Sequence, residues 1–140
     1  MRTMNEAETR AELIDPLLAA AGWGVVPGSR IRREYSITPG RLESGGRRGK
    51  ALTADYVLEF WNTKLATLEA KAEDKALTEG VGQTKGYAQK LALRFCYASN
   101  GRGIYGIDMA TGEEGESPAF PSPQALCDRL HATPSAWRDR

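Results

Sequence analysis

Hydrophobic and polar positions follow two different periods along the chain, and the first of them predicts an N-terminal helix. Apolar residues recur at helical spacing at Leu13, Ile14, Leu17, Leu18 and Ala21. Asn5 can cap this helix, with Glu8 three residues later as in a capping box, and Gly22 is a typical stop signal. Pro16 lies inside the pattern, so we expect the helix to bend or split there.

The apolar period then shortens to two, which predicts three consecutive strands over 31–37, 54–61 and 65–71. In the first strand, alternation places on one face Ile31, Arg33, Tyr35 and Ile37. The Gly- and Arg-rich stretch 38–50 has almost no apolar residues and is expected to form a loop or an irregular hairpin tip. We expect a turn at Asn62–Thr63 between the second and third strands.

A second helix is predicted over 77–93, where Gly80, Gly82 and Gly86 permit a close approach on one side. Strands over 95–99 and 104–109 follow, joined by a turn at Asn100–Gly101. An acidic loop at 113–116 and a short helix over 124–130 close the chain. The order α-β-β-β-α-β-β indicates one mixed α/β domain over 1–140, with an antiparallel meander and a right-handed crossover helix.

Composition narrows the function classes. The chain has 140 residues, 41% of them hydrophobic and 26% charged, which fits one globular domain. We recognise no apolar run of membrane-helix length and no secretory leader, so we expect a cytoplasmic protein with no membrane partner. One histidine and two cysteines argue against chemistry that needs two histidines, a Cys/His zinc site or a disulfide framework.

The net charge of +1 conceals an uneven distribution. Between positions 30 and 50, two acidic residues stand against seven basic ones: Arg30, Arg32, Arg33, Arg41, Arg47, Arg48 and Lys50. This segment carries +5 and leaves −4 for the rest of the chain. The whole-chain value argues against a strongly basic nucleic-acid binder. The segment is nevertheless suited to contact DNA phosphates without reading sequence, with a solvated loop as the alternative.

The third predicted strand carries charges that call for an explanation. Alternation places Glu69 and Lys71 on one face of a central strand, with Ala70 on the other, and burying charges there is costly. Asp55 stands fourteen residues before Glu69, at the start of the preceding strand. Two carboxylates and a lysine at a sheet edge favour a Mg²⁺ site for phosphoryl chemistry, because hard cations take oxygen ligands. The same spacing also occurs as ordinary surface charge.

The helix that follows this strand adds a second feature. Gln83 and Tyr87 are four residues apart and share one helical face. An amide and a phenol placed in this way can hydrogen-bond a nucleotide or support the lysine. The alternative is that Tyr87 belongs to the core and Gln83 faces solvent.

Taken together, these stretches resemble the N-terminal endonuclease domain of the R subunit of type I restriction-modification enzymes, a branch of the PD-(D/E)xK nuclease superfamily. The resemblance covers almost the whole chain and is carried by residues 5–18, 33–41, 54–59, 68–75, 77–80, 83–87 and 99–105. It implies a restriction-endonuclease-like fold, with an α-β-β-β-α-β core and a mixed central sheet flanked by helices.

The resemblance also implies a role for each matching residue. Asp55 and Glu69, with the backbone carbonyl of Ala70, would hold Mg²⁺, or Mn²⁺ in its place. Lys71 matches the catalytic lysine of the motif. Ala54 stands where the motif has a proline, a common departure.

Two helices supply the remaining matches. Gln83 and Tyr87 match a glutamine–tyrosine motif that this branch places beside the site. Glu8 matches an acidic residue that faces the metal in many members, and its role in a capping box is the alternative.

The expected function is a Mg²⁺-dependent endonuclease domain that acts on double-stranded DNA without sequence specificity of its own. The resemblance implies partners as well, namely a motor domain and the modification and specificity subunits of a type I complex. The alternative is a non-catalytic or truncated nuclease-like module that serves DNA binding or assembly.

A nuclease site requires Asp55 and Glu69 on one face of the sheet, which constrains the hairpin between them. A two-residue turn at Asn62–Thr63 would set Asp55 opposite Ala70 and put Glu69 on the wrong face. A three-residue connection would set Asp55 opposite Lys71. We therefore predict an odd-length loop or a bulge between the two acidic residues.

Overall fold

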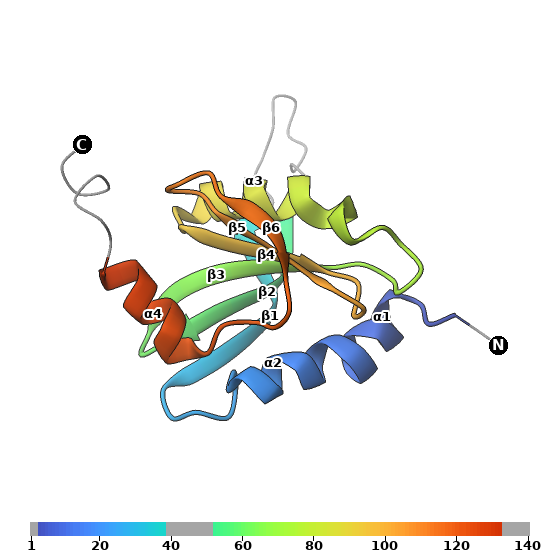
Figure 1. The fold of residues 1–140 in the computed structure, drawn as a ribbon, viewed down its shortest axis with the longest axis horizontal. Helices are drawn as coiled ribbons and strands as arrows, with labels where there is room; N and C mark the ends of the chain where they lie inside the picture. Colours follow the sequence, from blue (N-terminus) through green and yellow to red (C-terminus); the bar gives the residue numbers. More distant parts are fainter. Residues whose placement is uncertain (1–2, 39–51, 133–140) are drawn as a thin grey trace, which may run out of the picture.

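The computed structural model describes residues 3–38 and 52–132, and it confirms the mixed α/β fold. The first part contains α1 (Glu6–Thr9), a π-helical turn η1 (Arg10–Ile14), α2 (Asp15–Ala21) and β1 (Ser29–Thr38). The second part contains β2 (Leu52–Phe60), β3 (Thr63–Ala70), the 3-10 turn η2 (Leu77–Gly80), α3 (Val81–Leu91), β4 (Phe95–Ser99), β5 (Ile104–Asp108), β6 (Glu114–Ser117) and α4 (Pro123–His131). Figure 1 shows α1 and α2 along one face of the sheet and α3 across the other.

The six strands form one sheet in chain order, from β1 at one edge to β6 at the other. β1, β2 and β3 form the expected antiparallel meander, and β3 pairs with β4 in parallel through the crossover that contains α3. The acidic stretch expected as a loop is wrong in part, because Glu114–Ser117 pairs with β5 as an edge strand. Its alternating charges hid the strand in the sequence, and they also protect an exposed sheet edge from pairing with other chains.

The N-terminal helix begins and ends where the sequence predicts. The Asn5 side chain accepts a hydrogen bond from the Glu8 N–H, and the Glu8 carboxylate accepts one from the Asn5 N–H, which is the reciprocal capping box. Gly22 ends the helix in a left-handed conformation. The break expected near Pro16 occurs as the π-helical turn directly before it, since a proline cannot donate to the preceding turn.

Hydrophobic packing occurs on both faces of the sheet. On the side of the N-terminal helix, Ile14, Leu18 and Trp23 are fully buried against β2 and β3, together with Leu126 of α4. On the other side a smaller cluster joins α3 to β4 and β5. Next to this cluster, the hydroxyls of Thr67 and Thr84 lie 2.8 Å apart in a buried polar contact. The sheet is thereby held between two layers of helix.

The hairpin between β2 and β3 contains the predicted irregularity. The turn is Trp61–Asn62 rather than Asn62–Thr63, and both of its residues have positive φ, as a tight hairpin turn requires. The register shifts at Leu58/Glu59, where a bulge adds one residue to β3. Beyond the bulge Tyr56 pairs with Leu68, so neither detailed register considered from the sequence is correct. The predicted bulge itself is confirmed.

One strand departs from simple alternation. The Arg32 guanidinium and the Lys64 ammonium lie over the Tyr35 ring, whereas Arg33 lies over Tyr56, so Tyr35 does not share the face of Arg33 as predicted. Glu34 explains the difference, because it adopts a left-handed conformation with φ 52° and interrupts the pleat between Arg33 and Tyr35.

Within the described residues, no helix has the length and apolar character needed to cross a membrane. Most of the stretch expected as a loop over 38–50 lies outside the described residues.

Candidate active site

Asp55 and Glu69 meet at the end of the β2–β3 ladder and are locked together by hydrogen bonds. The Asp55 N–H donates to Glu69 Oε2 at 2.9 Å, and the Ala70 N–H donates to Asp55 Oδ2 at 2.8 Å. Continuing the register from Tyr56 and Leu68 sets the two acidic residues directly opposite each other. Opposite residues point to the same face, so the bulge in the hairpin is what brings the two carboxylates together.

The electrostatics of this pair are those of two carboxyl groups held close together, with the Arg10 guanidinium against Asp55. Glu69 is 3% exposed, and burial raises the pKa of its carboxyl, with the nearby Asp55 charge acting in the same direction. Burial likewise raises the pKa of Asp55, opposed by the Ala70 N–H and by Arg10. Two carboxylates this close in a low-dielectric setting favour a bound cation. The pair is therefore chemically suited to hold a metal ion.

Lys71 follows β3 directly and points to the same region. Its backbone N–H donates to the Ser99 carbonyl oxygen at 2.9 Å, which extends the parallel pairing with β4 by one residue. Its ammonium donates to the Gln83 Oε1 at 3.0 Å. This contact brings together two residues singled out in the sequence from different elements, and Gln83 thereby fixes where the Lys71 charge lies.

The turn at the start of α3 packs closely over the pair. Gly80 is buried, and a Cβ added there would lie 3.2 Å from Glu69 Cβ and 3.5 Å from Lys71 Cε. Burial raises the pKa of the Tyr87 phenol, and the charges of Glu69 and Asp55 act in the same direction. The role of Tyr87 beside the site, which the glutamine–tyrosine pattern implies, stays a prediction.

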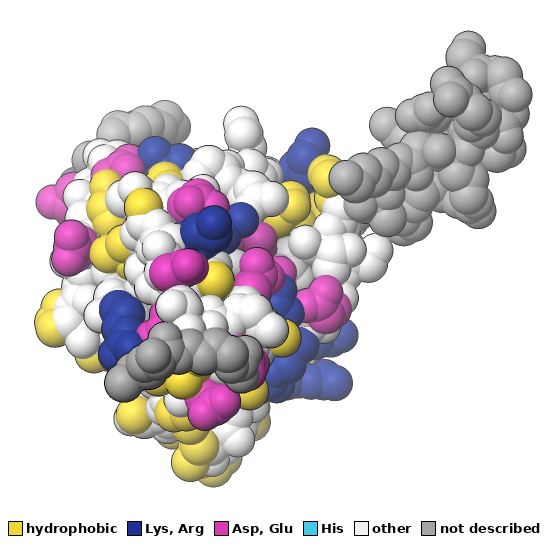
Figure 2. Space-filling model, turned by 90° about the vertical axis from the view of Figure 1, so that its right-hand side faces the viewer, with side chains coloured by type: hydrophobic (Ala, Val, Ile, Leu, Met, Phe, Trp, Pro, Cys, Tyr) yellow, Lys and Arg dark blue, Asp and Glu magenta, His cyan; other side chains and the backbone are white. Residues whose placement is uncertain are grey.

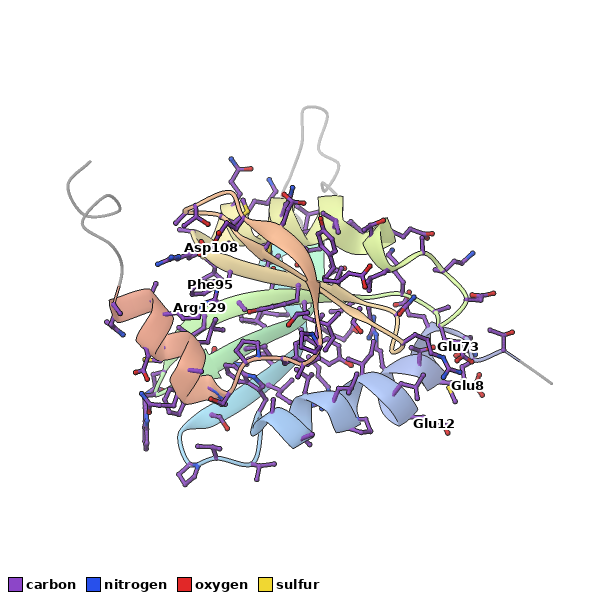
Figure 3. All side chains as sticks on the ribbon, in the orientation of Figure 1. Glu8, Glu12, Glu73, Phe95, Asp108 and Arg129 are labelled. Atoms are coloured by element: carbon purple, nitrogen blue, oxygen red, sulfur yellow. The ribbon has the colours of Figure 1, made fainter. Side chains whose placement is uncertain are left out.

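Arg10 of the N-terminal helical segment contacts Asp55, and this contact was not predicted from the sequence. The Arg10 Nη2 lies 2.5 Å from Asp55 Oδ1 and 2.8 Å from Glu6 Oε2, and its Nη1 contacts Glu34. Glu8 has its carboxylate in the capping box, so this alternative role is confirmed. A metal-facing role for Glu8 stays a prediction, with Figure 3 showing it near the N-terminus of α1.

A row of acidic residues across three strands was also missed. The pairing of Arg33 with Tyr56 and of Tyr35 with Ala54 sets Glu34 opposite Asp55, which in turn lies opposite Glu69. Helical spacing contained a signal for Arg10, because it precedes the buried Ile14 by four residues and so extends the buried stripe toward the sheet. The signal for Glu34 lay in the strand register, which the sequence alone does not define.

Of the predicted DNA-contacting residues, the structure describes Arg30, Arg32 and Arg33, and they do not share one face of the sheet. Arg32 lies 3.1 Å from the buried Glu59, while Arg33 pairs with Asp15 of α2 on the opposite face. Arg30 is exposed, and the remaining members, Arg41, Arg47, Arg48 and Lys50, lie outside the described residues. The DNA-contacting role of all seven stays a prediction.

The donor set limits which metal the site suits. The part of the chain that the structure describes has no cluster of three or more His, Cys, Asp and Glu side chains arranged to hold a metal ion. The protein oxygens that the structure brings together are then those of the two carboxylates, and the Ala70 carbonyl as a further ligand stays a prediction. Such a sparse set of hard oxygen ligands fits Mg²⁺ or Mn²⁺, which keep several waters, better than a metal that needs four protein ligands.

Over the described residues at this end of the molecule, charges of both signs are mixed (Figure 2). Figure 2, which views the end where the chain begins, shows acidic and basic side chains interspersed over the described surface. At the opposite end of Figure 3, Asp108 and Arg129 lie beside Phe95, and Asp108 is held by Arg94 at 2.8 Å. That cluster is internally paired and remote from Glu8 and Glu73 in the same view.

Comparison with known proteins agrees with the geometry. No protein-family model matches the chain. The chain is 31% identical over 141 residues to the type I restriction enzyme EcoAI endonuclease subunit of Escherichia coli, a match that covers 93% of this chain. A solved fragment from Vibrio vulnificus YJ016, assigned as the HsdR subunit of a type I restriction enzyme, matches 94% of the chain with a TM-score of 0.86 and 34% identity.

The two relatives are much longer than this chain. The matches span 17% of the Escherichia coli subunit and 26% of the Vibrio vulnificus fragment. Sequence and structure both agree over almost all of this chain, so the similarity is not one of fold alone. The chain is therefore a homologue of one part of the endonuclease subunit of type I restriction enzymes.

Proposed function

We propose that this chain is a Mg²⁺-dependent endonuclease domain that hydrolyses phosphodiester bonds of double-stranded DNA. The observation that carries the proposal is the hydrogen-bonded Asp55–Glu69 pair at the end of the β2–β3 ladder, in which Glu69 is buried and Asp55 is partly buried. Its homology to part of an endonuclease subunit supports the same activity. Mn²⁺ has the same preference for oxygen ligands and would serve in place of Mg²⁺.

Each residue of the site has a distinct part in this proposal. Asp55, Glu69 and the Ala70 carbonyl would hold the metal, which when bound supplies a Lewis acid that activates water and stabilises the phosphorane-like charge. The Lys71 ammonium, fixed by Gln83, would orient the attacking water and balance the negative charge that develops on the phosphate. In hydrolysis the water oxygen bonds to phosphorus and one sugar oxygen leaves as a hydroxyl.

Tyr87 and the arginines would act on the DNA rather than on the metal. Tyr87, four residues after Gln83 on α3, would line the DNA side of the site. The arginines of β1 would contact phosphates, which position the duplex without reading its sequence. Sequence recognition would then belong to the specificity and modification subunits of a type I complex, and delivery of DNA to a motor domain.

A nuclease-like module that serves DNA binding or assembly without cleavage is the second candidate function, because both oxygens of Asp55 already have donors in the protein, Arg10 and the Ala70 N–H. It predicts DNA binding, or metal binding, without cleavage. The two candidate functions therefore differ in one observable: an endonuclease domain nicks or linearises plasmid DNA, and a binding or assembly module does not.

Lys71→Ala is expected to reduce plasmid cleavage by about 100- to 1,000-fold, because it removes a preorganised charge at the reacting phosphate. Supercoiled plasmid is incubated with the chain over a titration of Mg²⁺ and of Mn²⁺. Lys85→Ala is the matched control, since Lys85 lies on the same helix as Gln83 but pairs with Glu114. Cleavage by Lys71→Ala at the wild-type rate would remove Lys71 from the mechanism, and no cleavage by any form would favour the binding module.

A further inference from the structure

Arg10 contacts one carboxylate of the proposed metal site, Asp55, so it must affect metal binding there. This inference rests on the proposed metal site. Its guanidinium lies 2.5 Å from Asp55 Oδ1, while Asp55 Oδ2 accepts the Ala70 N–H. Both oxygens of this carboxylate therefore already have a donor in the protein. A divalent cation that binds Asp55 meets a fixed positive charge in direct contact with its ligand.

The burial of this ion pair makes the competition strong. The side chains of Arg10 and Asp55 are 24% and 15% exposed, so solvent screens their attraction less than it screens a surface pair. In the described part of the chain, the Arg10 Nε is buried and has no hydrogen-bond partner.

Two further carboxylates give Arg10 an alternative position. Glu6 and Glu34 contact the same guanidinium and are 45% and 61% exposed, on the solvent side of the contact with Asp55. These two residues can retain the guanidinium if it moves away from Asp55. The π-helical turn begins at Arg10, whose side chain reaches Asp55 of the sheet. Such turns are frequent at functional sites.

We propose that Arg10 is a positioning residue that holds Asp55 in the metal-free protein and yields this carboxylate to the divalent cation. Arg10 thus competes with the metal for Asp55, and Glu6 and Glu34 retain it when the metal binds. The proposal predicts opposite effects of one substitution. Removing the guanidinium weakens the metal-free fold and strengthens metal binding, whereas a purely structural arginine would affect only the fold.

The test is calorimetric titration of the 140-residue chain with Mn²⁺ in the absence of DNA. Arg10→Gln is expected to lower the dissociation constant for Mn²⁺ about tenfold, since an adjacent opposite charge changes ionic equilibria at a carboxylate by roughly one to three powers of ten. Arg10→Lys retains the charge and should stay within about threefold of wild type. Arg102→Gln is the matched control, because Arg102 is 67% exposed and pairs with Glu73 instead. Equal or weaker Mn²⁺ binding by Arg10→Gln would overturn the proposal.

A measurement on the unsubstituted protein covers the case in which Arg10→Gln fails to fold. Mg²⁺ should shift the side-chain nitrogen resonances of Arg10 and leave those of Arg102 unchanged, and an unshifted Arg10 signal would overturn the inference. The proposed function fails separately. If wild type binds no Mn²⁺, or if Asp55→Asn binds it as tightly, the metal site itself is wrong whatever Arg10 does.

Discussion

Glu69→Gln is expected to abolish the stabilisation of the chain by Mg²⁺ and to reduce DNA cleavage by more than about 100-fold. The amide keeps the shape of the side chain and can still accept the Asp55 N–H, but it removes the negative charge that binds the cation. Residues that merely orient metal ligands contribute about 10- to 100-fold, so the loss of a ligand should exceed that range. The measurement is the thermal unfolding midpoint with and without Mg²⁺, alongside plasmid cleavage.

The same substitution should make the metal-free protein more stable. Burial and Asp55 raise the pKa of Glu69 in the folded state, so ionisation of Glu69 opposes folding once the pH exceeds the ordinary glutamate pKa of about 4.3. A neutral amide avoids this cost. We expect a gain of about 1–3 kcal/mol in unfolding free energy at pH 8, shrinking toward zero as the pH falls to about 4.

Glu59→Gln is the matched control for both effects. Glu59 is equally buried at 3% exposure, but it pairs with Arg32, away from the candidate site. It should retain the Mg²⁺ response and should be destabilised rather than stabilised, because the substitution leaves a charged arginine with a neutral partner. If both glutamine variants keep the Mg²⁺ response, Glu69 is not a metal ligand.

Gly101→Ala is expected to cost about 2–5 kcal/mol of unfolding free energy. Gly101 has φ +82°, and an added Cβ would lie 2.7 Å from Leu13 Cβ and 3.0 Å from Thr9 Cγ2. The left-handed conformation costs about 1–2 kcal/mol for an alanine, and overpacking costs about 1–3 kcal/mol more. Relief of the clash would move the helical segment that includes Arg10.

Gly112→Ala separates the two contributions. Gly112 has the same φ of +82°, but nothing lies within 4 Å of the position of its Cβ. This variant should therefore cost only about 1–2 kcal/mol, the conformational part. The two variants are compared by urea unfolding. Equal losses of unfolding free energy in the two variants would mean that the helix can shift at Leu13 without cost and is not packed tightly there.

Much of the fold could be predicted from the sequence because local signals define it. The capping box at Asn5 and the stop at Gly22 each depend on a few neighbouring residues, and the crossover between β3 and β4 follows from the order of the predicted elements. The requirement for a bulge followed from one geometric condition on Asp55 and Glu69. The contact between Lys71 and Gln83 agrees with the expected helix face.

Non-local pairing decided what the sequence could not show. The position of the hairpin turn depends on Trp61 and Asn62 both accepting positive φ, which asparagine favours but tryptophan does not. The row that runs from Glu34 through Asp55 exists only once the register of three strands is known. β6 was missed because Glu114 and Glu116 are typical of a loop, and only pairing with β5 makes their segment a strand.

The central claim, that the Asp55–Glu69 pair holds the catalytic cation, is tested most directly by anomalous diffraction from crystals of the chain grown with Mn²⁺. The account predicts one manganese peak bound by both carboxylates and adjacent to the Ala70 carbonyl oxygen. A map at saturating Mn²⁺ with no peak at this pair, or with its strongest peak at the acidic residues of β6, would contradict it.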